Sequence, residues 1–419
     1  MELCVYGDTL NALVTAAALA STGHRVSLRT LNEELNEQLH QGFTPFREHD
    51  LEQMLREQIA QQRLVVEERD APLAPCLRAM FFAFPETHYA LALELAQSLQ
   101  GHSFLLINQS AFQVGATEAL QEQFSGPVVA MPEFVQEGAA VESFVRPNRL
   151  LLGCDDAQAE RLVREIFRPF NRQKDHFQIM RPREAEFTKL AITGMLATRV
   201  SFMNDMANLA DMLDVDIEAV RQGVGADPRI GEAYLYPGSG FGGFGLVQNV
   251  THLAGTLASK GVKSTLLEQV LDINERQKEV MFRKLWRHYE TDLAGKTVAL
   301  WGAAFKPGTA RIDNAPAIAL IEALWAQGAS VAVHDPQALT TLQAHFAEPK
   351  GEIRYCADMY DAARQADALI LVTEWKTYWS PDFEALKQTM AAPLILDGRN
   401  IYEPDYVRQR GFTYYGVGR

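Results

Sequence analysis

The chain has 419 residues, which is long enough for two or three domains, each with its own core. Hydrophobic residues make up 47% and charged residues 22%, an ordinary globular composition that excludes a disordered chain or a low-complexity fibre. The formal net charge of −14 argues against nucleic acid as a partner, because binding a phosphate backbone needs a concentrated Lys/Arg surface.

The cysteines and the N-terminus indicate the compartment. Cys4, Cys76, Cys154 and Cys356 are scattered without CxxC spacing, which disfavours both a disulfide framework and a zinc site. Glu2 leads straight into a strand-like stretch without a basic leader, and no uncharged apolar run approaches membrane-spanning length. We therefore expect a soluble, unprocessed cytoplasmic protein with reduced thiols, no metal and no membrane contact.

The first third of the chain alternates short apolar strands with helical segments. It opens with a strand at 2–6, a turn at Gly7 and an Ala/Leu-rich helix at about 10–21. Further short strands are predicted at 25–29, 79–84, 103–108 and 127–131. This alternation is typical of a doubly wound parallel sheet, and we assign it to an N-terminal Rossmann domain over 1–178.

The middle of the chain is predicted to be helical and the last third to repeat the first. Residues 184–213 have a helical apolar pattern interrupted only by Gly194, and a second helix is predicted over 264–287. We assign 179–290 to a central helical domain. A strand followed by glycine at 297–302 and a second strand at 329–335 predict a C-terminal Rossmann-like domain over 291–419. The predicted fold is therefore α/β, with two Rossmann-like doubly wound domains joined by a long central helix and a ligand cleft between them.

A family resemblance is carried by six segments in chain order. They are Pro132-Glu-Phe-Val-Gln-Glu-Gly138, Glu184-Ala-Glu-Phe-Thr-Lys189, Pro237-Gly-Ser-Gly-Phe-Gly-Gly243, Trp301-Gly-Ala-Ala-Phe-Lys-Pro-Gly-Thr309, Thr373-Glu-Trp375 and Asp397-Gly-Arg-Asn400. Together they resemble the UDP-glucose/GDP-mannose 6-dehydrogenase family over essentially the whole chain. The resemblance implies two NAD-dependent oxidations at C6 of a nucleotide sugar, a homodimer formed through the central helix, and a role or protein partner in polysaccharide synthesis.

The dinucleotide fingerprint departs from the family pattern. Where the family has Gly-x-Gly-x-x-Gly, this chain has Gly7-Asp8-Thr9-Leu10-Asn11-Ala12. Gly7 is retained and Ala12 is small enough for helix–strand packing, but the side chain of Thr9 would occupy the space of the pyrophosphate. Asp8 either places a carboxylate where a phosphate should bind or caps the helix. The resemblance implies NAD as cofactor, and these changes predict that its binding is weakened or lost.

The ribose contact is altered as well. Thr30 stands where the family has an acidic residue, and Arg29 precedes it. An arginine at this point is compatible with the 2′-phosphate of NADP. The alternative is that the ribose contact has been lost, and we favour it because the pyrophosphate loop is also changed.

The nucleophile position is the largest departure. The family sequence Gly-Gly-Ser-Cys-Phe-Pro-Lys-Asp corresponds here to residues 242–249, so that Gly245 replaces the cysteine and Asn249 replaces the aspartate. A glycine forms neither a thiohemiacetal nor a thioester. The second oxidation, from aldehyde to acid, should therefore be absent, which favours a pseudoenzyme.

Other acid–base positions are partly retained. Lys189 matches the family's catalytic lysine, and its place in the Glu-Ala-Glu-x-x-Lys segment favours a site role over that of a surface helix lysine. Glu133 and Glu137 match the paired glutamates of the family. Against these, Thr193 and Ala111 replace an asparagine and a threonine of the family pattern.

The substrate pocket keeps more of the family pattern. Glycine-rich backbone suits a diphosphate, although the same loop is also compatible with an ordinary flexible turn. The position of a family arginine is Asp313, and whether Arg311 replaces it is left open. The predicted substrate-binding residues are Phe134, Tyr236, Gly238, Gly240, Gly242, Lys306 and Arg399.

Three functional hypotheses follow. The first is a catalytically inactive or impaired member with residual nucleotide-sugar binding. The second is an active NAD(P)-dependent oxidoreductase that performs only the alcohol-to-aldehyde step, which needs a base but no thiolate. The third is an assembly protein that uses its central helix.

Overall fold

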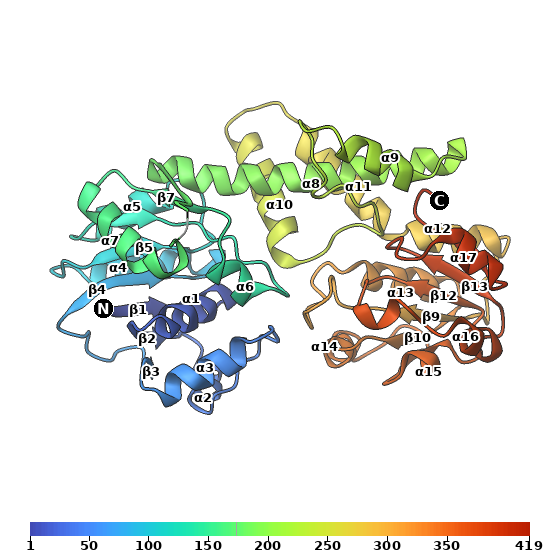
Figure 1. Ribbon diagram of the computed structural model, residues 1–419, viewed down its shortest axis with the longest axis horizontal. Helices are drawn as coiled ribbons and strands as arrows, with labels where there is room; N and C mark the ends of the chain where they lie inside the picture. The colour runs from blue at the N-terminus through green and yellow to red at the C-terminus, as the bar shows by residue number, and fades with distance from the viewer. Residues whose placement is uncertain (173) are drawn as a thin grey trace. The chain divides into compact units, whose positions relative to one another are not determined.

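The computed structural model describes residues 1–172 and 174–419 and contains two compact units, Met1–Lys189 and Leu190–Arg419 (Figure 1). Each unit is built around one β-sheet whose faces are covered by helices. This agrees with the predicted fold class of two Rossmann-like units and a long helix. The finer division at 178 and 290 into three domains stays a prediction.

The first sheet has eight strands in the order β3-β2-β1-β4-β5-β6-β7-β8. From β3 to β6 the strands are parallel, and their order is that of a dinucleotide-binding fold, with the switch point between β1 and β4. β7 runs antiparallel to β6 and parallel to β8. The strands are β1 (Glu2–Tyr6), β2 (Arg25–Arg29), β3 (Leu64–Glu67), β4 (Leu77–Phe82), β5 (Leu105–Asn108), β6 (Val128–Ala130), β7 (Leu150–Gly153) and β8 (Phe177–Met180).

Alternation along β1 directs side chains to the two faces of this sheet. Leu3 and Val5 lie in the core on one face, whereas Cys4 and Tyr6 lie in the core on the other. The first face is covered by α1 (Leu10–Ser21), α2 (Glu33–His40), α3 (Leu51–Ala60), α6 (Ala140–Val145) and α7 (Ala157–Phe167), and the second by α4 (Tyr89–Ser98) and α5 (Ala116–Gln123). The short helices of this unit are η1 (Glu86–His88) and η2 (Arg168–Phe170). Both faces are buried over the middle of the sheet, which is why β1 and β5 to β7 are mostly apolar, whereas the edge strand β8 is partly exposed.

The predicted long helix is confirmed, but the predicted second helix is not a single one. α8 extends without interruption over Pro182–Leu213. In place of one helix over 264–287 there are two, α11 (Leu266–Lys278) and α12 (Val280–His288), which meet at Glu279 in a non-helical conformation. α11 packs on α10 (Phe244–Ser259), α12 packs on the second sheet, and both contact α13 (Pro316–Ala326). The break therefore follows from tertiary packing, since neither Gly nor Pro marks it.

The second sheet has six parallel strands in the order β11-β10-β9-β12-β13-β14. This is again the dinucleotide-binding order, which confirms the predicted Rossmann-like repeat. The strands are β9 (Thr297–Trp301), β10 (Ser330–His334), β11 (Ile353–Tyr355), β12 (Ala368–Leu371), β13 (Leu394–Asp397) and β14 (Thr413–Tyr415). The other helices of this unit are α9 (Ile217–Gly225), α13 (Pro316–Ala326), α14 (Leu339–His345), α15 (Met359–Ala363), η3 (Lys376–Tyr378), α16 (Phe383–Thr389) and α17 (Pro404–Gln409).

The segment 416–419 after β14 is anchored to the start of α9. The Val417 side chain is completely buried. The backbone N–H of Ile217 donates to the carbonyl of Gly418 at 3.0 Å. The Arg419 guanidinium pairs with Asp216, Nε to Oδ1 at 3.0 Å. These contacts hold the last residues of the chain within the core of the second unit.

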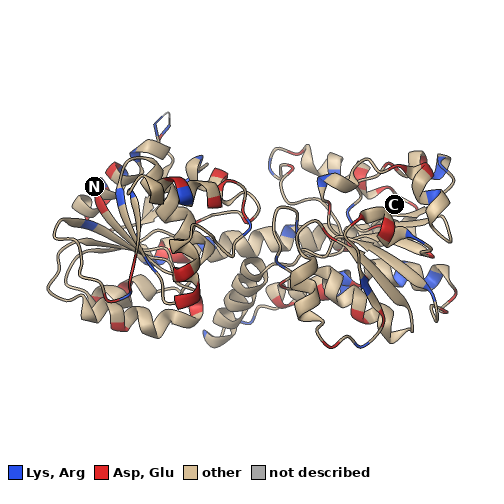
Figure 2. Ribbon diagram, turned by 90° about the horizontal axis from the view of Figure 1, so that it is seen from below, with Lys and Arg blue, Asp and Glu red and all other residues tan. Residues whose placement is uncertain are grey.

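Charged side chains of both signs are interspersed over the two units (Figure 2). No helix in the described ranges has the length and apolar character needed to cross a bilayer.

Candidate functional site

The turn after β1 is closed by the side chain of Thr9. Gly7 is required there, since a Cβ at this position would lie 2.1 Å from the carbonyl oxygen of Ala83. Thr9 is the N-cap residue of α1: its Oγ1 accepts from the N–H of Ala12 at 3.2 Å and donates to the oxygen of Ala83 at 2.9 Å. Of the two roles considered for Asp8, the capping role is wrong, because Thr9 caps the helix. One of the N–H groups that would face a phosphate is therefore already bonded.

The end of β2 is occupied by contacts within the chain. The buried Arg29 donates from Nη2 at 2.8 Å and from Nε at 3.1 Å to Oε2 of Glu67. Thr30 is also buried, and its hydroxyl donates to the carbonyl of Asn32 at 2.9 Å. A 2′-phosphate would have to displace the Arg29–Glu67 ion pair, which weakens the NADP interpretation of Arg29.

A buried polar cluster behind this turn was missed by the sequence analysis. Thr15 Oγ1 lies 3.1 Å from Gln109 Oε1 and 3.4 Å from Asn11 Oδ1, and a hydroxyl has one proton to donate. The Nδ2 atom of Asn11 is buried and has no hydrogen-bond partner among the residues that the structure describes. The signal in the sequence was the pair Asn11 and Thr15, two polar residues one turn apart in a helix that is mostly apolar.

The structure brings Lys189 and Glu133 together. The Lys189 ammonium donates to the backbone carbonyl of Glu133 and lies 4.0 Å from its Oε1. It also lies 4.5 Å from the ring centroid of Phe134. Lys189 therefore makes tertiary contacts and is not a lysine on a free helix surface, while its catalytic role stays a prediction.

Glu137 lies in the loop that follows β6. Glu48 accepts hydrogen bonds from the backbone N–H of Gly138 at 2.7 and 2.8 Å and from that of Ala140 at 3.2 Å. This carboxylate, which the sequence analysis missed, fixes the segment that carries Glu137.

Glu186 is a second carboxylate that the sequence analysis missed. It is buried at the start of α8 and accepts from the N–H of Gly115 at 2.6 Å, and from the N–H and hydroxyl of Thr117 at 2.8 and 2.7 Å. Because Gly115 offers no side chain to cap α5, Glu186 takes that role. It thereby fixes the loop that carries the exposed Ala111. Thr193, two turns further along α8, is buried.

In the second unit the glycine-rich loop 237–243 is held by side-chain amides. The N–H of Gly238 donates to Asn204 at 2.9 Å, and Gln277 donates to the carbonyl of Gly238 at 2.8 Å. Asn274 accepts from the N–H of Phe241 at 2.8 Å and donates to its carbonyl at 2.9 Å. The loop is a fixed segment rather than the flexible turn considered from sequence.

Close backbone contact explains a glycine of this loop. A Cβ at Gly242 would lie 2.7 Å from the carbonyl oxygen of Asn314. Arg399 contacts the loop, since its Nη1 lies 3.4 Å from the carbonyl of Gly240. Its Nε donates to the carbonyl of Val372 at 2.7 Å.

The remaining predicted substrate residues of the second unit differ in exposure. Lys306 is half-buried beside the ring of Phe305, with its Nζ 5.5 Å from the centroid. Tyr236 is exposed, and the guanidinium of Arg221 lies 4.2 Å from its ring centroid. Arg311 pairs with Asp313 at 2.8 Å. The sequence prediction about Arg311 therefore stays open.

Gly245 lies in the first turn of α10, a helix without a side-chain cap. It is exposed, and a Cβ built on it meets no atom within 4 Å. Asn249 follows one turn later and is half-buried. The space around Gly245 is thus open, and the correspondence of Gly245 to the family's cysteine stays a prediction.

The glycine turn after β9 is closed by Asp335. Its Oδ2 accepts from the N–H groups of Ala303 at 2.7 Å and Ala304 at 3.0 Å, and from Trp375 Nε1 at 3.0 Å. Its Oδ1 accepts two further backbone N–H groups, at 2.8 and 2.7 Å. Trp301 and Trp375 are both buried, in agreement with their interpretation as core residues.

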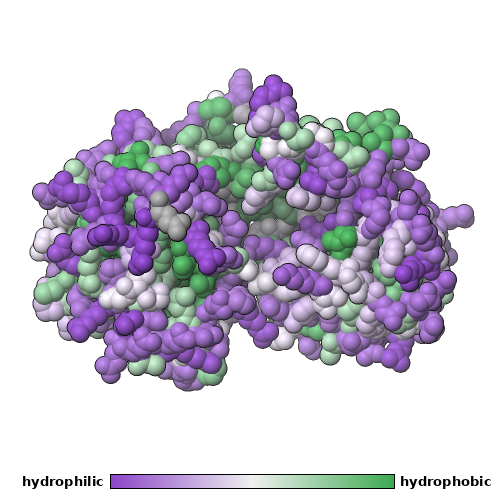
Figure 3. Space-filling model, viewed as in Figure 1, coloured by the Kyte–Doolittle hydropathy of each residue, from purple (hydrophilic) through white to green (hydrophobic). Residues whose placement is uncertain are grey.

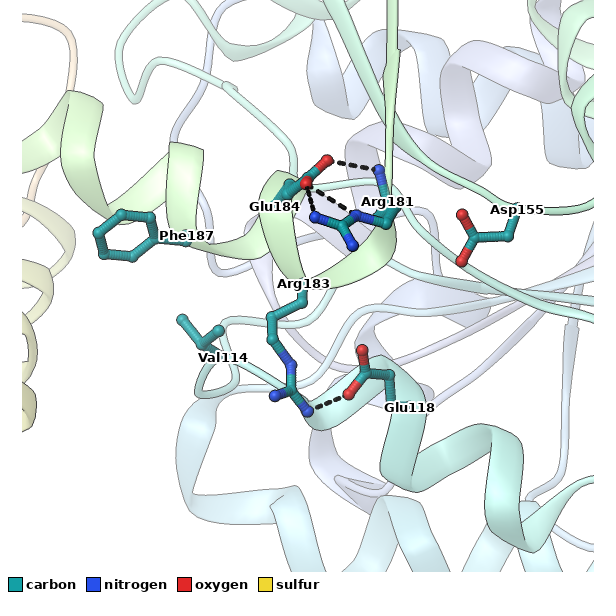
Figure 4. Close-up of a pocket in the computed structure, with 7 residues that line it drawn as sticks. All are labelled: Val114, Glu118, Asp155, Arg181, Arg183, Glu184 and Phe187. Atoms are coloured by element: carbon teal, nitrogen blue, oxygen red, sulfur yellow. Dashed lines mark hydrogen bonds and ion pairs between the residues drawn. The ribbon is translucent and has the colours of Figure 1, made fainter. Parts of the chain in front are cut away.

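A pocket of about 540 Å³ lies in the first unit (Figure 4). Four of its five charged residues are matched in pairs, since Arg181 pairs with Glu184 and Arg183 with Glu118. Its lining includes Glu184 and Phe187 of the segment 184–189 but none of the predicted site residues, and among the described residues no cluster of His, Cys, Asp and Glu is suited to a metal. The lining residues are Val114, Glu118, Asp155, Arg181, Arg183, Glu184 and Phe187.

Two sheets in dinucleotide-binding order, each with a glycine turn after its first strand, define a nucleotide-binding α/β protein with paired Rossmann units. Three profiles of one family match along the chain: the NAD binding domain at residues 87–171, the central domain at 183–276 and the UDP binding domain at 299–404. The chain belongs to the UDP-glucose/GDP-mannose dehydrogenase family.

Individual relatives agree with this assignment. A UDP-glucose 6-dehydrogenase of Pseudomonas aeruginosa is 37% identical over 443 residues, covering 100% of this chain and 98% of that protein. A UDP-glucose 6-dehydrogenase of Rhizobium meliloti is 32% identical over 441 residues and 100% of both chains. The structure of a UDP-glucose dehydrogenase from Pyrobaculum islandicum superposes with a TM-score of 0.88 at 27% identity, covering 100% of this chain and 97% of the other.

Proposed function

We propose that this protein binds a nucleotide sugar but does not carry out the complete two-step oxidation of its family. The observation that carries the proposal is Gly245, which stands where the family motif has its cysteine. A hydrogen atom forms no covalent adduct with an aldehyde, and the open space at this position contains no substitute side chain.

The cysteines elsewhere in the chain do not replace the missing nucleophile. Cys4, Cys154 and Cys356 are buried, and burial raises the pKa of each thiol, that of Cys4 to about 11. Near pH 7 they are therefore thiols and not thiolates. Cys76 is exposed but directly precedes β4, at the amino edge of the first sheet, whereas ligands of such sheets bind at the carboxyl edge.

The residues at the first glycine turn do not fit a dinucleotide. The pyrophosphate needs close approach to the backbone and free N–H groups, but the side chain of Thr9 lies at this turn and bonds one of those groups. Arg29 and Thr30 are committed to Glu67 and Asn32. The match to the family's NAD binding domain begins at residue 87, after this part of the chain. We infer that NAD binds weakly or not at all.

Nucleotide-sugar binding is the part of the family function that the residues support. The UDP binding domain matches over 299–404, a range that includes Lys306 and Arg399. The glycine-rich loop is held in place, and Arg399 lies against it. Cations beside fixed backbone N–H groups are suited to a diphosphate.

The decisive experiment is an assay of purified protein with UDP-glucose and NAD, following NADH formation and uronate by mass spectrometry. We expect no uronate. The double variant Thr9→Gly/Gly245→Cys should not recover full turnover, because Ala111, Thr193 and Asn249 still differ from the family pattern, and Thr9→Gly/Gly245→Ser serves as its control. Uronate formation by the unmodified chain would refute the proposal.

A second candidate function is supported by the contacts of Lys189 with Glu133. These residues suit the alcohol-to-aldehyde step, which needs no thiolate but does need a dinucleotide acceptor. Calorimetric titration with NAD and NADP, together with trapping of an aldehyde by hydroxylamine, separates the two functions. Tight dinucleotide binding with trapped aldehyde would favour the second.

We further propose that the protein is a homodimer assembled through α8. A role as an assembly partner in polysaccharide synthesis would depend on this dimer. Met195, Phe202 and Leu209 lie seven residues apart on one face of the helix and are 62%, 53% and 47% exposed. Figure 3 shows hydrophobic side chains at the surface near α8 and α9.

Light scattering after gel filtration tests the dimer. Phe202→Glu should give a monomer, whereas Val262→Glu, at an exposed valine outside α8, should leave the mass unchanged. A monomeric unmodified protein would exclude this interface.

A further inference from the structure

Glu374 lies directly after β12, at the switch point of the second sheet. The strands β9 and β12 are neighbours, and from them the sheet continues in opposite directions through β10 and β13. Ligands of such sheets bind outside the carboxyl ends of the strands at this point. The sequence analysis used the segment Thr373-Glu-Trp375 for the resemblance but assigned no role to Glu374.

The two neighbours of Glu374 in the chain fix its backbone. Thr373 is completely buried, and its hydroxyl donates to the carbonyl of Ala304 at 2.6 Å. Trp375 is buried as well, and its Nε1 donates to Asp335 at 3.0 Å. The side chain of Glu374 itself is 37% exposed. A carboxylate that solvent can reach therefore stands on a fixed backbone at the ligand edge of the sheet.

The carboxylate of Glu374 accepts no hydrogen bond from the residues that the structure describes. Its Oε2 lies 3.2 Å from the Nε of Arg399, but the single Nε proton is donated to the carbonyl of Val372 at 2.7 Å, so this contact is an ion pair only. Oε2 is buried and has no donor in that part of the chain, and Oε1 is the oxygen open to a ligand. Because a carboxylate has several lone pairs to offer, Glu374 has the capacity for a donor from outside the protein.

Arg399 offers hydrogen-bond donors beside this acceptor. Its backbone N–H donates to Oδ1 of Asp397 at 3.0 Å, and its Nη1 donates to the carbonyl of Gly240 at 3.4 Å. Its Nη2 makes no hydrogen bond within the described ranges. A guanidinium held in this way is suited to a phosphate. A donor for a diphosphate and an acceptor for a hydroxyl thus lie side by side within the second unit.

We propose that Glu374 contacts the nucleotide sugar directly and accepts a hydroxyl group of its hexose or ribose, while Arg399 binds the diphosphate. The inference rests on the proposed nucleotide-sugar binding and adds a contact to it. A hydroxyl has a proton to donate to the carboxylate, whereas a phosphate oxygen has only lone pairs and is repelled by it. The two side chains together therefore select a diphosphate that carries a ring with hydroxyl groups.

Calorimetry on the full chain with UDP-glucose, UDP and 2′,3′-dideoxyuridine diphosphate tests this assignment. The third ligand has the diphosphate but neither a hexose nor ribose hydroxyl groups. Glu374→Gln should weaken the binding of UDP-glucose about tenfold, because the acceptor loses its charge. It should not weaken the dideoxy ligand, since Arg399 only loses a neighbouring negative charge. Weakening of UDP as well would identify the ribose as the source of the hydroxyl, and weakening of UDP-glucose alone would identify the hexose.

Three further variants separate this contact from other effects. Glu403→Gln is the matched control, since Glu403 also follows β13 and pairs with an arginine, Arg419, at 3.6 Å, and it should change none of the affinities. Glu374→Asp keeps the charge and should retain part of the affinity for UDP-glucose. Arg399→Gln should weaken all three ligands, because each has a diphosphate. Circular dichroism melting curves verify that each variant is folded.

Each outcome decides the question. If Glu374→Gln leaves the affinity for UDP-glucose unchanged, the assignment is overturned, while nucleotide-sugar binding itself stands. Equal weakening of all three ligands also overturns it, because Glu374 then acts only through the position of Arg399. Unchanged affinities in Arg399→Gln place the diphosphate elsewhere and overturn it as well. If UDP-glucose does not bind to the unmodified protein, both this inference and the proposed function fail.

Discussion

The two units contain the same turn and close it in different ways. Gly7 follows β1 and Gly302 follows β9, and an added Cβ would lie 2.1 Å from Ala83 O in the first turn and 2.4 Å from Thr373 Cβ in the second. In the first unit the turn is closed by the hydroxyl of Thr9, which lies within the turn itself. In the second it is closed by the carboxylate of Asp335, which follows β10.

This difference shows that strand order does not decide whether a Rossmann turn is open to a phosphate. Asp335 occupies the place that an acidic residue has at the end of the second strand of a dinucleotide fold, but its oxygens accept five N–H groups of the protein. At the corresponding place in the first unit, Thr30 follows Arg29. In both units, single side chains beside the turn determine whether its N–H groups are free to bind a phosphate.

The two units can be followed separately because their fluorophores are distributed unequally. All five tryptophans of the chain lie in the second unit, so tryptophan fluorescence reports the unfolding of that unit, whereas circular dichroism reports both. The tryptophans are Trp286, Trp301, Trp325, Trp375 and Trp379.

The largest expected effect is that of Asp335→Ala. It leaves the N–H groups of Ala303, Ala304 and Trp375 without their acceptor in the core and should lower the free energy of unfolding by about 4 kcal/mol. Urea denaturation followed by tryptophan fluorescence measures it. As control, Asp358→Ala removes an exposed helix cap of the same unit and should cost about 1 kcal/mol. Equal losses in the two variants would contradict the role given to Asp335.

The second largest effect is expected for Glu186→Ala in the first unit. It should lower the free energy of unfolding by about 3 kcal/mol, because the N–H groups of Gly115 and Thr117 lose a buried charged acceptor. The transition seen by circular dichroism should move while that of tryptophan fluorescence stays in place. Glu184→Ala is the control: its ion pair with Arg181 is exposed, and its loss should change stability by less than about 0.5 kcal/mol. A shift of the fluorescence transition by the same amount would show that the two units unfold together.

A smaller effect is expected for Thr9→Ala, which removes the N-cap of α1 and should cost about 1 kcal/mol, whereas Thr9→Ser keeps the hydroxyl and the stability. Thr9→Gly should cost only a few tenths of a kcal/mol, at the low end of the effects of cap loss. Titration of Thr9→Gly with NAD should show higher affinity than that of the unmodified protein. An unchanged affinity would mean that Thr9 is not what closes this turn to the cofactor.

The smallest effect concerns pH and is of the same sign in both units. Burial lowers the pKa of His24 in the first unit and of His334 in the second below the ordinary value of 6.5. The unfolded chain then takes up protons before the folded one, so both units should lose stability as pH falls below about 6.5 and toward the folded-state pKa values. Urea midpoints at pH 7.5 and 5.5 measure the loss. His24→Gln should reduce it in the circular dichroism transition alone; the same loss in this variant would assign the effect to other groups.

The sequence predicted the elements that are bounded by local signals. β1, α1 and β2 were placed at their observed positions because Gly7 and Gly23 mark the turns between them. The long helix was predicted from the helical spacing of its apolar residues, and the second Rossmann unit from a strand followed by Gly302. The strands β3, β7 and β8 were not predicted, and the direction of β7 has no local signal, since an apolar run of four residues reads alike in parallel and antiparallel strands.

Residues of the candidate site could be proposed from the sequence where a family motif covers them. Contacts between segments that are distant in the sequence could not. Thr9 and Gly245 were identified from the motif alone. That the partner of Arg29 is Glu67 and that Arg149 contacts Phe134 depend on strand pairing, which no local pattern in the sequence encodes. The predicted roles of Lys189, Glu133, Glu137 and the substrate residues await the experiments above.

The anchored segment 416–419 has a practical consequence for protein production. With Val417 buried and Arg419 joined to Asp216, an affinity tag fused directly behind Arg419 would begin against the first turn of α9. Placing the tag ahead of Met1, which is half-buried, leaves the contacts of Val417 and Arg419 undisturbed. Vectors for every variant considered above are best designed in that orientation.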